Sequence, residues 1–139
     1  MKTIIAAAIA AFALGGAAQA ADAANGESVF AKRCKTCHAI VSPAGEEIVK
    51  GGKTGPNQWG TIGHKAGSHA DFDKYGDSLV AAGEKGLVWT EEEVVKYLAD
   101  PRAYLREYLG DPKARSLMAF KLAKEEEAAD VAAYLAQFQ

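Results

Sequence analysis

The residues with the clearest capacity for chemistry are Cys34, Cys37 and His38, in the stretch CKTCH. Two cysteines three positions apart, followed directly by a histidine, suit a structural disulfide, a zinc half-site, a thiol redox pair or the covalent attachment of a haem. On a helix, both cysteines would lie on one face and could bond to the two vinyl groups of one porphyrin. His38 would then place its imidazole under the iron. Haem attachment is the interpretation that uses all three residues together.

The sequence lacks a feature that each of the other three interpretations, a disulfide, a zinc site or a thiol redox pair, would need. A disulfide between residues this close hardly restrains the unfolded chain and adds little stability. Zinc needs about four ligands, and the remaining histidines, His64 and His69, lack the usual paired spacing. A thioredoxin-like pair would need a surrounding βαβ pattern, and the sequence has no convincing run of alternating strand residues.

A haem that transfers electrons needs a second axial ligand, usually Met or His. Apart from Met1, the chain holds one methionine, Met118, in the irregular stretch SLMAFKL with basic residues nearby. A buried core methionine is the alternative interpretation. His64 and His69 compete as ligands, and we interpret both as solvated loop residues. A bound Met118 would close the iron to oxygen and peroxide, whereas an open position would indicate a haem peroxidase or a gas-binding protein.

The first 20 residues have the features of a secretory signal peptide. Lys2 precedes an apolar run over residues 4–14, and Ala-Gln-Ala at residues 18–20 is typical of a cleavage site. A retained membrane anchor is the alternative. Cleavage would leave one domain, residues 21–139, with 15 basic and 18 acidic side chains. This balance, without a basic tract, argues against nucleic acid as a partner. We expect a soluble protein of the periplasm, an oxidising compartment where haem attachment takes place.

Two helix starts follow from capping chemistry. Thr90 with Glu93 three residues later forms a capping-box pattern. Asp100 followed by Pro101 predicts a second cap with proline at the first helical position, and Gly110 ends that helix.

Three more helices are predicted from apolar spacing and glycine positions: residues 26–38, residues 74–82 with Gly83 as the stop, and residues 124–138. Strands are few or absent. Two long irregular stretches, residues 40–70 and 110–123, are unusual in a compact domain unless they serve a site. The fold class is therefore all-α, with four to five helices and long loops around a group that fills the centre.

Seven motifs occur in a fixed order along residues 21–139: Gly26…Phe30…CKTCH, KTGPN, FDKYGDS, GLVW, YLADPRAYLREYLGD, MAFKL and AAYL. In these motifs the chain resembles the class I c-type cytochromes, and among them the cytochromes c2 of purple photosynthetic bacteria. The resemblance implies the class I cytochrome c fold with one covalently bound haem c. It also implies that Gly26 and Phe30 on the first helix cross Tyr134 on the last.

The resemblance assigns further roles by position. Cys34 and Cys37 would hold the haem, and His38 and Met118 would be the axial iron ligands. Four residues would form the haem environment: Pro56 as acceptor for the second nitrogen of His38, Tyr75 and Trp89 as hydrogen-bond partners of a haem propionate, and Phe120 as cover for the exposed haem edge.

Three positions depart from the family pattern. Gln58 stands where an apolar residue is usual, and it would need a hydrogen-bond partner if buried. Leu117 stands where the family often has Lys. His64 stands where relatives commonly have Arg near a propionate, so we expect the reduction potential to depend on pH.

The resemblance implies an electron carrier and not an enzyme. It would take single electrons from a membrane quinol-oxidising cytochrome bc complex and deliver them to a photosynthetic reaction centre or a terminal oxidase. We expect a monomer that docks through basic residues flanking the attachment and methionine segments: Arg33, Lys35, Lys53, Lys113, Arg115 and Lys121.

Overall fold

The computed structural model describes residues 20–139, so the predicted signal peptide lies almost wholly outside the described residues. Within them the elements are α1 (Ala23–Arg33), β1 (Ile40–Val41), β2 (Glu47–Val49), α2 (Asp77–Glu84), α3 (Glu91–Ala99), α4 (Pro101–Leu109) and α5 (Glu125–Leu135). The predicted all-α class is confirmed, since five helices and one short hairpin account for the regular structure of this part. None of the helices described is long and apolar enough to cross a membrane.

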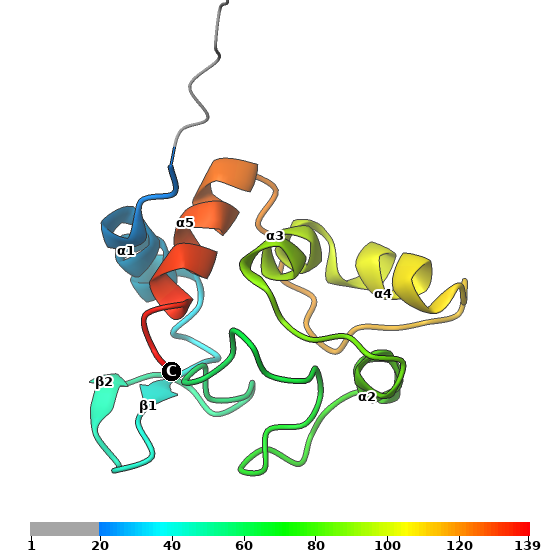
Figure 1. Ribbon diagram of the computed structural model, residues 1–139, viewed down its shortest axis with the longest axis horizontal. Helices are drawn as coiled ribbons and strands as arrows, with labels where there is room; N and C mark the ends of the chain where they lie inside the picture. Colours follow the sequence, from blue (N-terminus) through cyan, green and yellow to red (C-terminus); the bar gives the residue numbers. More distant parts are fainter. Residues whose placement is uncertain (1–19) are drawn as a thin grey trace, which may run out of the picture.

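Helices α1, α3, α4 and α5 lie in the upper part of the view in Figure 1, and α2 lies lower, beside the long loop that precedes it. α1 and α5 lie side by side, α5 also contacts α3, and α4 lies against α3 and α2. The hairpin of β1 and β2 and the long loop before α2 lie below α1, α3 and α5 in this view. The end of α1, directly before Cys34, faces this loop region, which is therefore where the site must be sought.

The crossing of α1 and α5 depends on one glycine. A Cβ atom at Gly26 would lie 1.9 Å from the backbone oxygen of Asp130, so the two backbones touch where they cross. Phe30 and Tyr134, with ring centroids 5.9 Å apart, pack beside this contact. The carboxylate of Asp130 is 4% exposed and accepts hydrogen bonds from the Asp22 amide (2.6 Å) and the Asn25 side chain (2.7 Å). The predicted contact of Gly26 and Phe30 with Tyr134 is confirmed.

α1 ends five residues earlier than the sequence predicts. Arg33 is its last residue, and residues 34–37 continue as turns. The reason is a competing loop: Gly52 donates its backbone N–H to the Lys35 carbonyl (2.8 Å), and Gly55 donates to the Cys37 carbonyl (2.9 Å). Helical bonds from further along the chain would need these carbonyls, so the loop ends the helix.

α2 also differs from its prediction. It spans Asp77–Glu84, so Gly83 lies inside the helix and does not stop it. A Cβ at Gly83 would lie 2.0 Å from the Ala66 carbonyl oxygen, which shows that this glycine permits close packing of the loop. The chain turns away at Gly86, whose φ of +112° is open to glycine.

The remaining helix boundaries follow the predicted caps closely. The Thr90 hydroxyl accepts from the Glu93 amide (3.1 Å), and the Asp100 carboxylate accepts from the Ala103 amide (3.0 Å). Gly110 ends α4 with φ of +67°. α5 stops at Leu135, three residues before Phe138, which packs on other aromatic rings beyond the helix.

Candidate functional site

A cavity of about 590 Å³ lies between the helices and the loops. Its lining comes from the end of α1, the loop before α2, helices α3 and α5, and the segment around Met118. Much of the wall is apolar, with contributions from Phe30, Leu98, Val131 and Leu135. All eight site residues predicted from the sequence line this cavity: Cys34, Cys37, His38, Pro56, Tyr75, Trp89, Met118 and Phe120.

The two cysteines form no disulfide, and both line the cavity. Burial raises the pKa of Cys34 to about 11, and the neighbouring Cys37 adds to this rise. The residues that the structure describes contain no group of three or more His, Cys, Asp or Glu side chains able to hold a metal ion.

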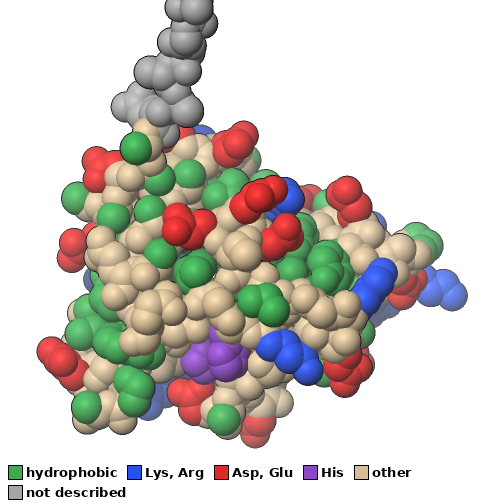
Figure 2. Space-filling model, viewed as in Figure 1, with side chains coloured by type: hydrophobic (Ala, Val, Ile, Leu, Met, Phe, Trp, Pro, Cys, Tyr) green, Lys and Arg blue, Asp and Glu red, His purple; other side chains and the backbone are tan. Residues whose placement is uncertain are grey.

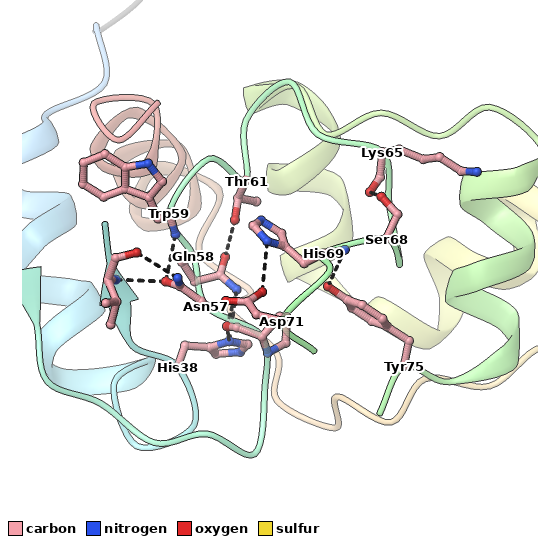
Figure 3. Close-up of polar contacts among 12 residues, drawn as sticks. His38, Asn57, Gln58, Trp59, Thr61, Lys65, Ser68, His69, Asp71 and Tyr75 are labelled. Carbon is pink, nitrogen blue, oxygen red and sulfur yellow. Dashed lines mark hydrogen bonds and ion pairs between the residues drawn. The ribbon is translucent and has the colours of Figure 1, made fainter. Parts of the chain in front are cut away.

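The His38 ring is held by the loop that follows it (Figure 3). Its Nδ1 lies 2.8 Å from the Pro56 carbonyl oxygen, and a Cβ at Gly55 would lie 2.3 Å from the ring. A carbonyl can only accept, so Nδ1 carries the proton and Nε2 keeps its lone pair. Burial lowers the pKa of His38, while the bond to Pro56 opposes this shift. A neutral imidazole with a free Nε2 is the form that binds metals.

Gln58 has partners on both ends of its amide (Figure 3). Its Nε2 donates to the Pro56 carbonyl (3.1 Å), and its Oε1 accepts from the Thr61 hydroxyl (3.1 Å). The Gln58 nitrogen also lies 3.0 Å from His38 Nδ1, but both nitrogens are donors when Nδ1 serves Pro56. The Pro56 oxygen therefore accepts from two side chains, and the polar residue at position 58 is satisfied.

Met118 is held through its backbone. The Ser116 hydroxyl donates to the Met118 carbonyl (2.9 Å) and lies 3.3 Å from the Tyr97 hydroxyl. Burial raises the pKa of Tyr97, so the phenol stays neutral. Leu117 is 73% exposed, whereas Met118 is partly buried against the core. Sequence reasoning missed Ser116 and Tyr97, because neither belongs to a motif with metal-ligand spacing.

The other predicted haem contacts lie on the same wall. The Tyr75 hydroxyl accepts from the His69 amide (3.3 Å), and the Trp89 ring packs 4.9 Å from the Tyr97 ring. Phe120 is half-buried at the cavity.

The interpretation of His64 and His69 as solvated loop residues is wrong. Both line the cavity, and the Nε2 atom of each is buried without a hydrogen-bond partner among the described residues.

The six predicted docking cations differ in their surroundings. Arg33 and Arg115 line the cavity, while Lys35, Lys53 and Lys113 are exposed away from its lining. Lys121 forms an ion pair with Asp100 (2.5 Å). Lys65 and Lys74 also line the cavity and escaped the sequence prediction. On the face drawn in Figure 2, acidic and basic side chains are interspersed, and neither sign forms a continuous patch.

These observations test whether the cavity fits a haem. The two thiols, a neutral imidazole with a free Nε2, and a thioether line one largely apolar cavity. The unpartnered Nε2 atoms of His64 and His69 add polar groups that match an occupant carrying carboxylates. The residues present fit the group.

An all-α fold closed around such a cavity defines the class I cytochrome c fold. No family model matches the chain. The chain is 55% identical over 134 residues to cytochrome c2 of Rhodobacter capsulatus, covering 96% of this chain and 95% of that protein. It is 61% identical over 115 residues to cytochrome c-551 of Roseobacter denitrificans, covering 83% and 79%. The solved structure of cytochrome c2 from Rhodobacter sphaeroides superposes with a TM-score of 0.82 at 46% identity, covering 85% and 96%.

The chain belongs to the cytochrome c2 family. It carries one covalently attached haem c, and it is an electron-transfer protein and not an enzyme.

Proposed function

We propose that this protein is a soluble periplasmic carrier of single electrons. It takes them from a membrane quinol-oxidising cytochrome bc complex and delivers them to a photosynthetic reaction centre or a terminal oxidase. The observation that carries this proposal is that CKTCH and Met118 line one mostly apolar cavity. Such a site supplies two axial donors, so it leaves no coordination position for a substrate.

In this proposal Cys34 and Cys37 would hold the haem through thioether links, and His38 and Met118 would ligate its iron. The haem supplies the one-electron chemistry of its iron. The chain does the rest: Pro56 and Gly55 fix the His38 ring, and the bond at Nδ1 makes Nε2 a stronger donor. The neutral thioether of Met118 favours ferrous iron and so raises the reduction potential.

The Tyr75 and Trp89 side chains are proposed to bind a propionate, and Phe120 to cover the haem edge. Their positions on the cavity wall support these roles. The apolar wall excludes water, which limits the solvent reorganisation that each change of charge requires.

The ligand assignment is tested by Met118→Ala in the holoprotein. We expect the potential to fall by a sizeable part of the roughly 0.8 V that axial ligands span, and azide or imidazole to bind the iron. Leu117→Ala is the matched control, because its side chain is exposed and next in sequence. An unchanged potential and an unchanged near-infrared ligand band in Met118→Ala would refute the assignment.

Docking is proposed to be electrostatic and local. Arg33, Lys35, Lys53, Lys113 and Arg115 have no ion-pair partner among the described residues, so their charges are available to an acidic surface. The electron leaves through the haem edge, and cations around that edge orient the partner and raise the encounter rate.

The test is the bimolecular electron-transfer rate to an acidic-faced partner. It should fall steeply with salt, since the Debye length is about 10 Å at 0.1 M. Lys35→Glu should slow the reaction most, and Lys121→Glu less, because Asp100 already neutralises that lysine. Lys96→Glu is the control, since Lys96 pairs with Glu92 (2.7 Å) and Glu93 (3.2 Å) on α3. Equal effects at all three positions would show that net charge governs docking.

Export is proposed to involve cleavage after Ala20, which would leave residues 21–139 as a monomer. The apolar run and the Ala-Gln-Ala pattern support this proposal. Sequencing the N-terminus of the protein from a periplasmic extract tests the cleavage point, and sedimentation tests the monomer. A retained residue 1 or a stable dimer would contradict it.

A further inference from the structure

Asp100, at the junction of α3 and α4, joins two parts of the chain through one side chain. Its Oδ1 accepts from the Ala103 amide (3.0 Å) and caps α4, and its Oδ2 accepts from the Lys121 Nζ (2.5 Å). The bond to the Ala103 amide and the pairing with Lys121 lower the pKa of Asp100, so the carboxylate is charged at neutral pH. The cap gives this carboxylate a fixed position, and Lys121 reaches it from a segment 21 residues further along the chain.

The same junction also holds the residue after Lys121, through its backbone. The Leu122 amide donates to the Leu98 carbonyl (2.8 Å), which lies in the last turn of α3. A carbonyl in the last turn has no partner within its own helix, so it can accept this bond. The Leu98 and Leu122 side chains are buried in one core cluster. Residues 121–122 are thus fixed against residues 98–100 from two sides, by an exposed ion pair and by a backbone bond in the core.

These two tethers lie three and four residues after Met118. Figure 1 shows the chain between α4 and α5 running back below α4 toward α3, and this described stretch contains no helix or strand. On the other side of Met118, the Arg115 amide donates to the Ser78 hydroxyl of α2 (3.0 Å). Three residues span at most about 10 Å, so a fixed Lys121 limits how far Met118 can move from the cavity. Contacts at both ends of the Met118 segment, residues 115–121, therefore restrict where the methionine can lie.

We propose that Lys121 is a positioning residue: through Asp100 it holds the Met118 segment against the α3–α4 junction and so keeps the methionine at the iron. The inference rests on the proposed function, because it needs Met118 as the axial ligand.

This role differs from the docking role that the sequence suggested for Lys121. An acidic partner that bound this lysine would leave the Asp100 carboxylate, 35% exposed, without its ion pair and facing the partner's own carboxylates. Like charges brought together in this way weaken an interface. Lys121 is therefore a poorer docking cation than Lys35, which has no ion-pair partner among the described residues.

The test is the affinity of the ferric holoprotein for imidazole, which must displace the Met118 thioether from the iron. Lys121→Leu removes the charge, so we expect imidazole to bind about two- to fivefold more tightly, the range that an exposed ion pair supports. Asp100→Ser keeps an oxygen that caps α4 and removes the carboxylate, so it should have the same effect. The double variant should show no further gain, because each single change already breaks the pair. Loss of the near-infrared ligand band reports the displacement.

Two control variants separate positioning from a general loss of stability. Lys121→Arg keeps the ion pair and should bind imidazole as the wild type does. Lys96→Leu breaks the exposed pairs of Lys96 with Glu92 (2.7 Å) and Glu93 (3.2 Å) on α3, so it should leave the imidazole affinity unchanged. Tighter binding of imidazole in Lys96→Leu, equal to that in Lys121→Leu, would overturn the positioning role.

The proposal also fails if Lys121→Leu and Asp100→Ser bind imidazole like the wild type, or if their effects are independent and add. The electron-transfer rate to an acidic-faced partner gives a further test, since Lys121→Leu should slow it much less than Lys35→Leu does. Equal slowing by both, with an unchanged imidazole affinity, would make Lys121 a docking cation. Failure of the proposed function would look different, because the wild-type holoprotein would then lack the near-infrared ligand band.

Discussion

The α1–α5 corner and the loop wall of the cavity are built in different ways. At the corner, α1 and α5 cross closely and bury Phe30, Val131 and Tyr134, and the Gly26 contact fixes their approach. On the loop wall, between residues 50 and 76, the described chain has no helix or strand. Hydrogen bonds of Pro56, Gln58 and Thr61 hold this wall together. The haem in the cavity would supply the remaining contacts.

This difference indicates what each region needs for its stability. Both regions border the cavity of about 590 Å³, to which the corner contributes Phe30 and Val131. The corner side chains also pack on one another and are at most 4% exposed, whereas Ala66 is the buried apolar side chain that residues 50–76 contribute. The corner should therefore be stable by its own packing, whereas the loop wall should depend on the haem.

The largest expected effect comes from preventing haem attachment with Cys34→Ala/Cys37→Ala. Without the haem, the mostly apolar wall of this cavity stays exposed to water, so the haem's contribution to apolar burial is lost. We expect residues 50–76 to lose all amide hydrogen-exchange protection, and α1 and α5 to retain some. Wild-type holoprotein is the reference. Equal loss in both regions would show that the corner has no stability of its own.

The next largest effect should come from Gly26→Val, which places a side chain where α1 and α5 touch. The added side chain meets the Asp130 backbone, which cannot rotate away. We expect a loss of about 3 kcal/mol in the free energy of unfolding, measured by denaturant titration. Ala31→Val on the same helix adds similar volume at an exposed position and should cost well under half of this. A Gly26→Val protein as stable as this control would refute the close crossing.

The smallest effect should come from Gln58→Leu on the loop wall. Losing one of two donors makes the Pro56 oxygen a better acceptor for His38, which strengthens the imidazole as an electron donor and favours ferric iron. We expect the potential to fall by at most about 60 mV, the one-electron equivalent of a tenfold change. Redox titration measures it, and Gln58→Glu, which replaces the donor with an acceptor, should move the potential further. A rise in potential would contradict the shared-acceptor geometry.

Local chemistry explains which helix boundaries the sequence predicted correctly. Thr90 and Asp100 accept from amides three residues along, so their effect is contained within one turn. Gly83 and the end of α1 were mispredicted because partners distant in sequence decide them. Ala66 packs on Gly83, and Gly52 takes the Lys35 carbonyl. No window of neighbouring residues contains that information.

In the candidate site, too, the residues recognised by local sequence pattern were predicted, and those that depend on distant contacts were not. CKTCH and Met118 could be identified from residue type, spacing and scarcity. The burial of His69 could not, because a histidine in a glycine-rich loop has the same pattern whether its ring faces water or a cavity. Ser116 and Tyr97 escaped notice because their hydrogen bonds join α3 to a segment 19 residues away.

The loop of Gly51 and Gly52, which ends α1, also covers the backbone of the attachment segment. In the finished fold, a Cβ at Gly51 would lie 1.9 Å from the His38 carbonyl oxygen, and one at Gly52 would lie 2.1 Å from the Thr36 carbonyl oxygen. The loop thus closes directly over the backbone between the two thiols. A side chain at Gly51 or Gly52 would push the loop off this backbone, so the cover over the attachment segment depends on two positions without side chains.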